Sequence, residues 1–303
     1  MFEKESAIAG EAARAAGEIL MRMLGDAHHI VKKGEIDLVT EADLAAEKRV
    51  LEIVGRNFPG DAILAEETGR QNAEGVRTWL IDPLDGTTNY AHGFPFFAVS
   101  IALEVENEGV LGIVYNPCMN EFFEAAKGKG ARLNGEPLRV SEIASFQDSL
   151  LATGFPYDVH QRPEQVMDLF EGMLVRAQGI RRLGSAALDL CYVAAGRLEG
   201  FWEQDLKPWD TAAGEIIVRE AGGRVTTFAG KPYTPYLESV LASNGLIHDD
   251  MLEVVKGWQM EPESRNAERG SGRSEDRREG SEDTEDKGQG MKSGEGGMIR
   301  RVG

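Results

Sequence analysis

The chain of 303 residues carries 51 acidic and 33 basic residues, which gives a formal net charge of −18 and a sequence pI of about 4.8. A chain this acidic is repelled by phosphate backbones, so a nucleic-acid binder held by bulk charge is excluded. No apolar run approaches the roughly 20 residues that a membrane-spanning helix needs, so we expect no membrane protein. With 42 % hydrophobic residues, the chain can bury a substantial core.

The first half of the chain is predicted to be rich in sheet. Apolar residues at helical spacing predict a helix over residues 8–23 and a second helix from Glu41 to the residues before Pro59. Strand-like segments separated by turn residues follow, at residues 96–105, 110–115 and 121–126. We therefore expect an N-terminal α+β half over residues 1–145.

The second half alternates between strands and helices, which predicts a layered α/β half over residues 146–260. The run from Glu261 to the end differs in character, because it has no aromatic residue, nine glycines and almost balanced charge, with 11 acidic and 9 basic residues. Such a segment cannot bury enough apolar area to offset chain entropy, so we expect a disordered charged tail over residues 261–303. The alternative is a partner-binding tail anchored by residues 298–301.

The position of the cysteines and the N-terminal residues predicts the compartment. Cys118 and Cys191 are isolated from each other, so they form neither a disulfide framework nor a zinc-ligand spacing. The first five residues lack the basic start and the apolar stretch of a signal peptide. We expect a cytoplasmic protein.

The most informative stretch is an apolar segment that ends in two carboxylates, Asp82 and Asp85, with Pro83 fixing a turn between them. The carbonyl of Leu84 lies between the acids, and such hard oxygen ligands suit Mg²⁺. The next residues, 86–88, offer backbone N–H groups at a predicted helix start, where phosphate can bind. The alternative is structural, with Asp82 capping a turn and Asp85 capping a helix.

Two further acidic features favour the metal site over the structural alternative. Glu66 and Glu67 directly follow a short apolar strand, and Asp210 lies at a predicted helix start. Acids at such places line the ligand crevice of open α/β folds. A pair of arginines, Arg181 and Arg182, could reach a phosphate or pair with surface acids, and the surface pairing is favoured.

Residues 79–92 and 209–223 resemble the two signature motifs of the inositol monophosphatase family of magnesium-dependent, lithium-sensitive phosphatases. Residues 37–43, 66–68 and 181–189 also fit the order and spacing of that family. The resemblance covers roughly residues 1–258, and the run from Glu261 has no counterpart in the family pattern. It implies an α/β fold of the layered α+β kind, the αβαβα sandwich of this family.

The resemblance implies two or three Mg²⁺ ions. Glu66, Asp82 and the Leu84 carbonyl would hold the first ion, and Asp82, Asp85 and Asp210 the second. Two such ions can lower the pKa of a bound water and stabilise the attacking and leaving oxygens, so that no covalent nucleophile is needed.

The catalytic residues implied by the resemblance are Glu66, Asp43 and Thr87. A third, weaker ion of some members would lie near Glu66, with Asp43 on its water shell. The Thr87 hydroxyl would help to position the attacking water, and the N–H groups of Gly86 and Thr87 would bind phosphate oxygens.

The implied substrate contacts lie on both sides of the site. Glu203 would hold the hydroxyls of a sugar or inositol, and Gly184, Ser185 and Ala186 would supply the backbone beside the ring. The implied contacts on the phosphate side are Glu66, Leu84, Asp85, Gly86, Thr87 and Asp210.

The predicted function is hydrolysis of a small phosphorylated polyol or sugar, with myo-inositol 1-phosphate as the leading substrate. Fructose 1,6-bisphosphate is the main alternative within the superfamily, ahead of nucleotide 3′-phosphates and histidinol phosphate. A hypothesis of another class is an accessory protein of a transcription complex, as in some bacterial relatives. We expect no direct nucleic-acid partner and no membrane partner, and the resemblance implies a homodimer.

Overall fold

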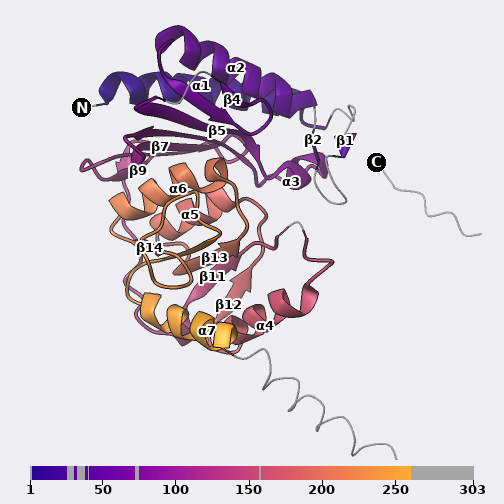
Figure 1. Cartoon of the computed structure of the whole chain (residues 1–303), viewed down its shortest axis with the longest axis vertical. Helices are drawn as coiled ribbons and strands as arrows, with labels where there is room; N and C mark the ends of the chain where they lie inside the picture. Colours follow the sequence, from indigo (N-terminus) through magenta and orange to yellow (C-terminus); the bar gives the residue numbers. More distant parts are fainter. Residues whose placement is uncertain are drawn as a thin grey trace, which may run out of the picture. The chain divides into compact units, whose positions relative to one another are not determined.

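Helices and sheets stack in five layers in the order helix, sheet, helix, sheet, helix (Figure 1). The computed structural model describes residues 2–25, 31–32, 38–39, 41–71, 75–156 and 158–260. The layering confirms the predicted αβαβα sandwich. The predicted disorder of residues 261–303 lies outside the described residues, and the predicted boundary between residues 145 and 146 stays a prediction.

Three pairs of helices form the helical layers. The first outer layer is α1 (Glu3–Met23) with α2 (Glu41–Asn57), the central layer is α5 (Ala186–Ala194) with α6 (Pro208–Glu220), and the last is α4 (Pro163–Leu174) with α7 (His248–Met260). The short elements are α3 (Thr87–Ala91), the 3₁₀ helix η1 (Phe146–Asp148) and the antiparallel pair β1 (Val31–Lys32) and β2 (Leu38–Val39). None of the helices in the described part of the chain combines the length and the apolar character needed to cross a bilayer.

The first sheet has eight strands, in the order β10-β9-β8-β7-β6-β5-β3-β4. Their bounds are β3 (Ala62–Ala65), β4 (Gly69–Gln71), β5 (Arg77–Asp85), β6 (Ala98–Val105), β7 (Glu108–Asn116), β8 (Glu121–Ala126), β9 (Ala131–Leu133) and β10 (Glu136–Pro137). The three strands predicted at residues 96–105, 110–115 and 121–126 are present as β6, β7 and β8. β3 and β5 are parallel, with Ala65 paired to Ile81, so the residues that follow both strands meet at one edge of the sheet.

The second sheet is mixed, in the order β12-β11-β13-β15-β14. Its strands are β11 (Leu150–Thr153), β12 (Gly179–Arg181), β13 (Gly200–Gln204), β14 (Arg224–Thr226) and β15 (Ser239–Ser243). β11 runs parallel to β12 and β13, whereas β15 is antiparallel to β13 and β14. The predicted alternation of strands and helices is therefore present. The strand β12 was not predicted, because its three residues are too few and too polar to show a strand pattern.

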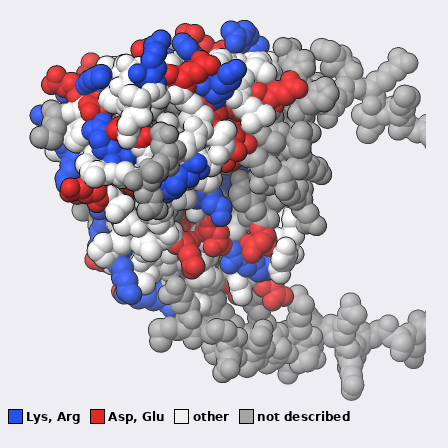
Figure 2. Space-filling model, turned by 45° about the horizontal axis from the view of Figure 1, so that its top comes forward, with Lys and Arg blue, Asp and Glu red and all other residues white. Residues whose placement is uncertain are grey.

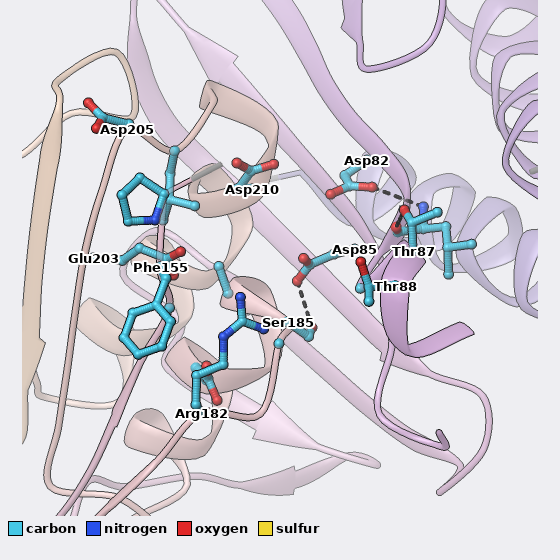
Figure 3. Close-up of a pocket in the computed structure, with 18 of the residues that line it drawn as sticks. Asp82, Asp85, Thr87, Thr88, Phe155, Arg182, Ser185, Glu203, Asp205 and Asp210 are labelled. Atoms are coloured by element: carbon cyan, nitrogen blue, oxygen red, sulfur yellow. Dashed lines mark hydrogen bonds between the residues drawn. The ribbon is translucent and has the colours of Figure 1, made fainter. Parts of the chain in front are cut away.

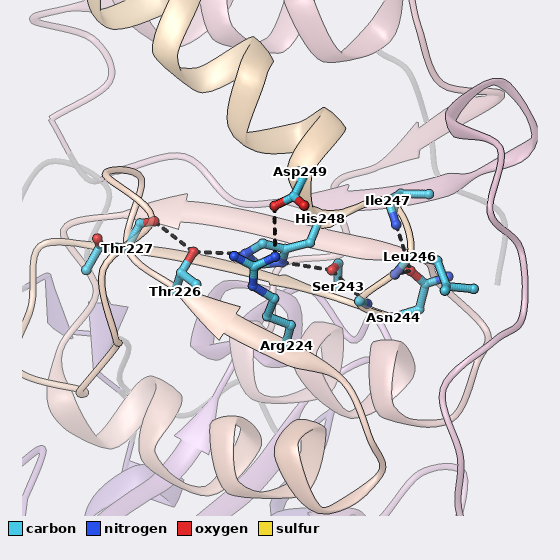
Figure 4. A network of polar contacts seen from close by, with 10 residues as sticks. Arg224, Thr226, Thr227, Ser243, Asn244, Leu246, Ile247, His248 and Asp249 are labelled. Atoms are coloured by element: carbon cyan, nitrogen blue, oxygen red, sulfur yellow. Dashed lines mark hydrogen bonds and ion pairs between the residues drawn. The ribbon is translucent and has the colours of Figure 1, made fainter.

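A buried polar network fixes the start of α7. The ring of His248 is fully buried, and its two nitrogens lie 2.9 Å from Thr226 Oγ1 and 2.8 Å from Ser243 Oγ (Figure 4). Burial lowers the pKa of His248 to about 4, so the neutral ring is the form that the core accepts. Arg224 and Asp249 pair beside the ring at 2.8 Å, which ties β14 to the first turn of α7.

Small residues allow the central helices to lie against the first sheet. A Cβ atom added to Gly112 on β7 would lie 2.5 Å from the carbonyl oxygen of Ala213 and 3.0 Å from its Cα. Both neighbours are backbone atoms of α6, so they cannot rotate away. Glycine at residue 112 therefore sets the distance between α6 and the sheet, and with it the position of the start of α6.

Gly112→Ala should destabilise the protein, because the added methyl group overlaps with the backbone of α6. We expect the free energy of unfolding to fall by about 1–3 kcal/mol, which corresponds to about 2–4 °C in Tm per kcal/mol for a chain of this size. Thermal unfolding followed by circular dichroism measures the change. Gly60→Ala is the matched control, since nothing lies within 4 Å of a Cβ at that residue. Equal Tm values for the two variants would contradict the assigned role of Gly112.

Candidate active site

A cavity of about 410 Å³ lies between the end of β5 and the elements β13, α5 and α6 (Figure 3). Of the predicted site residues, the structure places eleven on its lining: Glu66, Asp82, Leu84, Asp85, Gly86, Thr87, Gly184, Ser185, Ala186, Glu203 and Asp210. Asp43, on α2, does not line the cavity, but its Oδ1 lies 3.3 Å from the hydroxyl of Thr87. The fold thus brings together residues that are widely separated in the chain.

The end of β5 differs from the predicted turn. The strand continues through Pro83 to Asp85, and its pairing with β6 is irregular between Asp82 and Asp85. Proline has no N–H to donate to a ladder, so a bulge is one of the few places in a sheet where it fits. The Leu84 N–H donates to Asp82 Oδ1 at 2.9 Å, and the hydroxyl of Thr87 donates to the Leu84 carbonyl at 3.1 Å.

Asp85 reaches across the cavity to the central helix layer. Its Oδ2 accepts hydrogen bonds from the Ser185 hydroxyl at 2.6 Å and from the Ala187 N–H at 2.7 Å (Figure 3). Ala187 is in the first turn of α5, so the carboxylate satisfies one of the N–H groups that a helix start leaves without an intrahelical acceptor. The alternative prediction, that Asp85 caps a helix, is therefore partly confirmed. The helix that it caps is α5, whereas the helix that follows Asp85 in the chain is α3.

Glu66 is held in place by an acid that the sequence reasoning missed. Glu47 on α2 is buried, and its two carboxylate oxygens accept the N–H groups of Glu67 at 2.8 Å and Thr68 at 2.9 Å. The Glu66 N–H donates to the Ile81 carbonyl at 3.1 Å. These bonds fix the turn after β3, so that Glu66 lies beside the end of β5. A signal was present in the sequence, because Glu47 is a charged residue on the apolar face of the predicted helix.

Asp210 occupies the first turn of α6, as the sequence predicted. The helix begins at Pro208, and the Lys207 N–H donates to Asp210 Oδ2 at 2.7 Å. The hydroxyl of Ser100 on β6 donates to the Trp209 carbonyl at 3.2 Å, which ties the start of α6 to the first sheet. The side chain of Asp210 therefore faces the acids of β5 (Figure 3).

The buried carboxyl groups strongly affect one another. Burial raises the pKa of Asp82 well above its ordinary value, and the charges of Glu66, Asp85 and Asp210 raise it further. Burial also raises the pKa of Asp85 to about 6, against the opposing effect of the hydrogen bonds from Ser185 and Ala187. The pKa of Asp210 is raised well above its ordinary value by burial first and by Asp85 second.

These acids have the chemistry of a site for hard cations. Carboxylate and carbonyl oxygens are the donors that Mg²⁺ prefers, and repulsion among buried acids falls when cations lie between them. Among the residues that the structure describes, no group of three or more acidic, histidine or cysteine side chains lies close enough together to hold a metal ion by itself. Mg²⁺ usually keeps several waters, so a cation at these acids would complete its coordination with water.

The residues after β5 offer hydrogen-bond donors to an anion. α3 begins at Thr87, and the N–H groups of Thr87 and Thr88 have no acceptor within the helix. Both residues line the cavity. Gly86 precedes them with a φ of 100°, and a Cβ there would lie 3.1 Å from the carbonyl oxygens of Phe96 and Gly184. Glycine is therefore required at residue 86 on conformational and steric grounds.

The opposite side of the cavity carries a second polar group of residues. Burial raises the pKa of Glu203 on β13 to about 8, with Arg182 lowering it and Asp85 raising it. A Cβ at Gly154 would collide with the Glu203 carboxylate, so this glycine makes room for the acid. Phe155, Arg182 and Asp189 also line the cavity, and the sequence reasoning assigned none of them to the site.

Arg182 corrects the prediction that the arginine pair makes surface ion pairs. Among the described residues, neither Arg181 nor Arg182 forms an ion pair with an acid, and Arg182 points into the cavity (Figure 3). Arg181 is the last residue of β12 and Arg182 follows the strand, and only Arg182 lines the cavity. The only signal in the sequence was its position three residues before Ser185.

The pH dependence of stability tests the electrostatics of the metal-free protein. A group whose pKa is raised on folding contributes stability that is complete below its unfolded pKa and is lost as the pH rises through its folded pKa. For Asp85 this window runs from about pH 4 to about pH 6. We expect Asp85→Asn to gain stability relative to the wild type across this window, by about 3 kcal/mol. Tm measured in a chelator at several pH values checks the difference.

The control for this experiment is Glu142→Gln, which changes an exposed acid outside the cavity and should follow the wild type at every pH. If Asp85 is a ligand, as the family resemblance implies, added Mg²⁺ should raise the Tm of the wild type more than that of Asp85→Asn. If Tm changes with pH in the same way for Asp85→Asn and the wild type from pH 4 to pH 7, folding does not raise the pKa of Asp85.

Comparison with known proteins agrees with the geometry. The model of the inositol monophosphatase family matches residues 2–259. An inositol-1-monophosphatase of Synechocystis is 46 % identical over 250 residues, covering 82 % of this chain and 87 % of the relative. The Nus factor SuhB of Vibrio cholerae is also 46 % identical, over 235 residues that cover 77 % of this chain and 87 % of the relative.

The solved structures lead to the same conclusion. An inositol monophosphatase from Anabaena superposes with a TM-score of 0.78 at 42 % identity, covering 87 % of this chain and 99 % of that structure. The Thermotoga maritima IMPase TM1415 gives a TM-score of 0.77 at 40 % identity, covering 86 % and 98 %. The cavity with its buried acids and the match along the whole described body lead to one conclusion: the chain belongs to the inositol monophosphatase family and is a phosphoric monoester hydrolase.

Proposed function

We propose that the protein hydrolyses the phosphate monoester of a small polyol in a Mg²⁺-dependent reaction, with myo-inositol 1-phosphate as substrate and inositol and phosphate as products. One observation carries the proposal. Acids from three separate parts of the fold, namely the turn after β3, the end of β5 and the start of α6, face one cavity next to the helix start at Thr87. The names of relatives such as the Synechocystis inositol-1-monophosphatase support the substrate.

The residues that would hold two or three Mg²⁺ ions are Glu66, Asp82, the Leu84 carbonyl, Asp85 and Asp210. When bound, the ions would neutralise negative charge and lower the pKa of a bound water, and both effects speed hydrolysis of a phosphate ester. The buried acids are already held by backbone and hydroxyl donors, so little reorganisation is needed when cations bind. The family's sensitivity to lithium is expected here for the same site.

The chain's own groups hold the reactants. The Thr87 hydroxyl lies between the Leu84 carbonyl and Asp43, and in this place it orients the attacking water. The N–H groups of Gly86 and Thr87, with that of Thr88, bind phosphate oxygens. On the other side of the cavity Glu203 accepts a hydroxyl of the polyol, beside the backbone of residues 184–186.

The assay is phosphate release from myo-inositol 1-phosphate, fructose 1,6-bisphosphate and other sugar phosphates, with and without Mg²⁺. We expect activity only with Mg²⁺, and the highest kcat/KM with the inositol ester. Asp210→Asn should lower kcat by at least about 100-fold, because it removes charge that holds the ions. Asp250→Asn, which changes an exposed acid on α7, is the matched control and should retain full activity. Full activity of Asp210→Asn, or hydrolysis without any divalent cation, would refute the proposal.

A second candidate function is a role in a transcription complex. The observation that favours it is the name of the relatives: proteins called Nus factor SuhB from Vibrio cholerae and Escherichia coli are 46 % and 41 % identical to this chain. The net charge of −18 and the mixed acidic and basic side chains on the face in Figure 2 favour protein partners over direct RNA contact.

Co-purification of RNA polymerase subunits with the tagged full-length chain tests this role. If the role is independent of hydrolysis, Asp85→Asn should capture the same subunits as the wild type while its phosphatase activity is lost. Failure of the wild type to retain any polymerase subunit would refute it. The homodimer implied by the family stays a prediction, and sedimentation of the full chain measures it.

A further inference from the structure

Asn89 joins the two sides of the active site and has no part in the reaction as proposed above. It lies on α3, directly after the residues 86–88 that bind phosphate in the proposed function, and it is half-buried. The backbone assigned to the polyol, at residues 184–186, belongs to a distant part of the chain, since 94 residues separate Asn89 from Leu183. The contacts of Asn89 hold these two segments together.

The side-chain amide of Asn89 donates to backbone carbonyls of two different segments. Its Nδ2 lies 2.7 Å from the carbonyl oxygen of Phe96 and 2.8 Å from that of Leu183. The carbonyl oxygen of Gly184 lies 3.4 Å away and is a third, weaker acceptor. An amide nitrogen carries two hydrogens, so the two short bonds use both of them. These three partners are all acceptors, so a side chain without a donor cannot replace Asn89.

Two glycines allow the backbone to come close to this amide. A Cβ on Gly184 would lie 3.1 Å from Asn89 Nδ2, and Gly184 has a φ of 87°. From the phosphate side, a Cβ on Gly86 would lie 3.1 Å from the carbonyl oxygens of Phe96 and Gly184. Both glycines therefore lie at the junction of the two segments, where a larger residue would push them apart.

Asp85 makes a second contact between the same two sides, but this residue has another task. Its Oδ2 accepts hydrogen bonds from the Ser185 hydroxyl and the Ala187 N–H (Figure 3). In the proposed function Asp85 also holds a cation, so its oxygens are shared between the cation and these donors. The amide of Asn89 is neutral and does not change its charge with pH. Its bonds therefore hold the junction independently of cations.

The separation of the two segments matters because one substrate molecule has to reach both. In the proposed function, the phosphate oxygens bond to the N–H groups of residues 86–88 while the polyol lies beside residues 184–186. The ester bond links these two parts of the substrate. A displacement of either segment by about 1 Å would misalign the ester bond with the acids, and misplacement of that size can lower a rate by about 100-fold.

We propose that Asn89 is a positioning residue for the reaction, because it fixes the separation between the phosphate-binding residues 86–88 and the polyol-binding backbone at residues 184–186. The residue itself does not contact the substrate and acts through these two segments. The inference rests on the proposed phosphatase function and deepens it, since it names the contact that matches the site to the length of a polyol monophosphate.

The test compares Asn89→Ala with the wild type on two esters in Mg²⁺, namely myo-inositol 1-phosphate and phenyl phosphate, which has no hydroxyl groups on its ring. For the inositol ester kcat should fall by about 10–100-fold. Its KM should stay within about 3-fold, because no group that contacts the substrate is removed. For phenyl phosphate kcat should stay within about 3-fold, since this ester has no hydroxyl to be held beside residues 184–186.

Asn89→Asp is a second variant with nearly the same shape. It replaces the donor by a carboxylate oxygen, which the carbonyl oxygens of Phe96 and Leu183 repel. For the inositol ester kcat should therefore fall at least as far as in Asn89→Ala. A wild-type kcat of Asn89→Asp on this ester would overturn the proposal, because the donated hydrogen bonds would then be dispensable.

Asn57→Ala is the matched control. Asn57 is also half-buried, and its Nδ2 also donates to a backbone carbonyl, that of Ile53 at 2.9 Å, but both residues belong to α2. The same kind of bond is thus removed away from the cavity, and kcat should be unchanged on both esters. Thermal unfolding of all three variants, followed by circular dichroism, checks that they are folded at the assay temperature. Equal losses of kcat in Asn57→Ala and Asn89→Ala on the inositol ester would also overturn the proposal.

The two esters separate a failure of this inference from a failure of the proposed function. A wild type that releases phosphate from neither ester with Mg²⁺ would refute the proposed function and this inference with it. An active wild type whose Asn89→Ala variant loses the same factor of kcat on both esters would refute this inference alone. In that case Asn89 would support the phosphate side by itself, with no role in matching it to the polyol side.

Discussion

Burial of several carboxyl groups around one cavity is the constraint on which the rest of the active site depends. The pKa of Asp82, Asp85 and Asp210 is raised in each case by burial first, and by neighbouring acids as well. Acids in such a place disfavour the folded state unless they are protonated or neutralised. The fold therefore has to hold them together against their repulsion, and cations bound between them would remove part of that cost.

Hydrogen bonds from the backbone hold the acids in place against their mutual repulsion. Each of the three aspartates accepts a backbone N–H, from Leu84, Ala187 and Lys207 respectively. Glu66 is held less directly, through the turn that Glu47 anchors. The donors come from different elements of the first sheet and the central helix layer, so the site is also a place where these layers are joined. Close backbone packing, as between Gly112 and Ala213, sets the distance between those layers.

The cavity has two sides with different electrostatics. One side has acids and N–H donors, an arrangement suited to cations and phosphate together. On the other side a single guanidinium stands beside Glu203 and Asp189, with the ring of Phe155 next to it. Under the proposed function, the ester would be cleaved on the first side and the alcohol would be recognised on the second.

Local pattern predicted many of the elements. Strand-like segments separated by turn residues predicted β6, β7 and β8, and Asp210 was predicted at a helix start, which is the start of α6. The turn predicted at Pro83 was wrong, because pairing with β6 extends β5 through a bulge to Asp85. The short strand β12 gave no signal, since three residues are too few to show a period.

The sequence by itself determined the layered α/β fold, the family and the kinds of side chain that carry the chemistry, because these depend on residue type and on spacing along the chain. Only the tertiary structure decided that Asp85 caps α5, 102 residues away, and that Arg182 faces the cavity while Arg181 does not. Such contacts depend on how distant layers pack and on the direction in which the chain leaves a short strand. Neither is encoded in the local pattern.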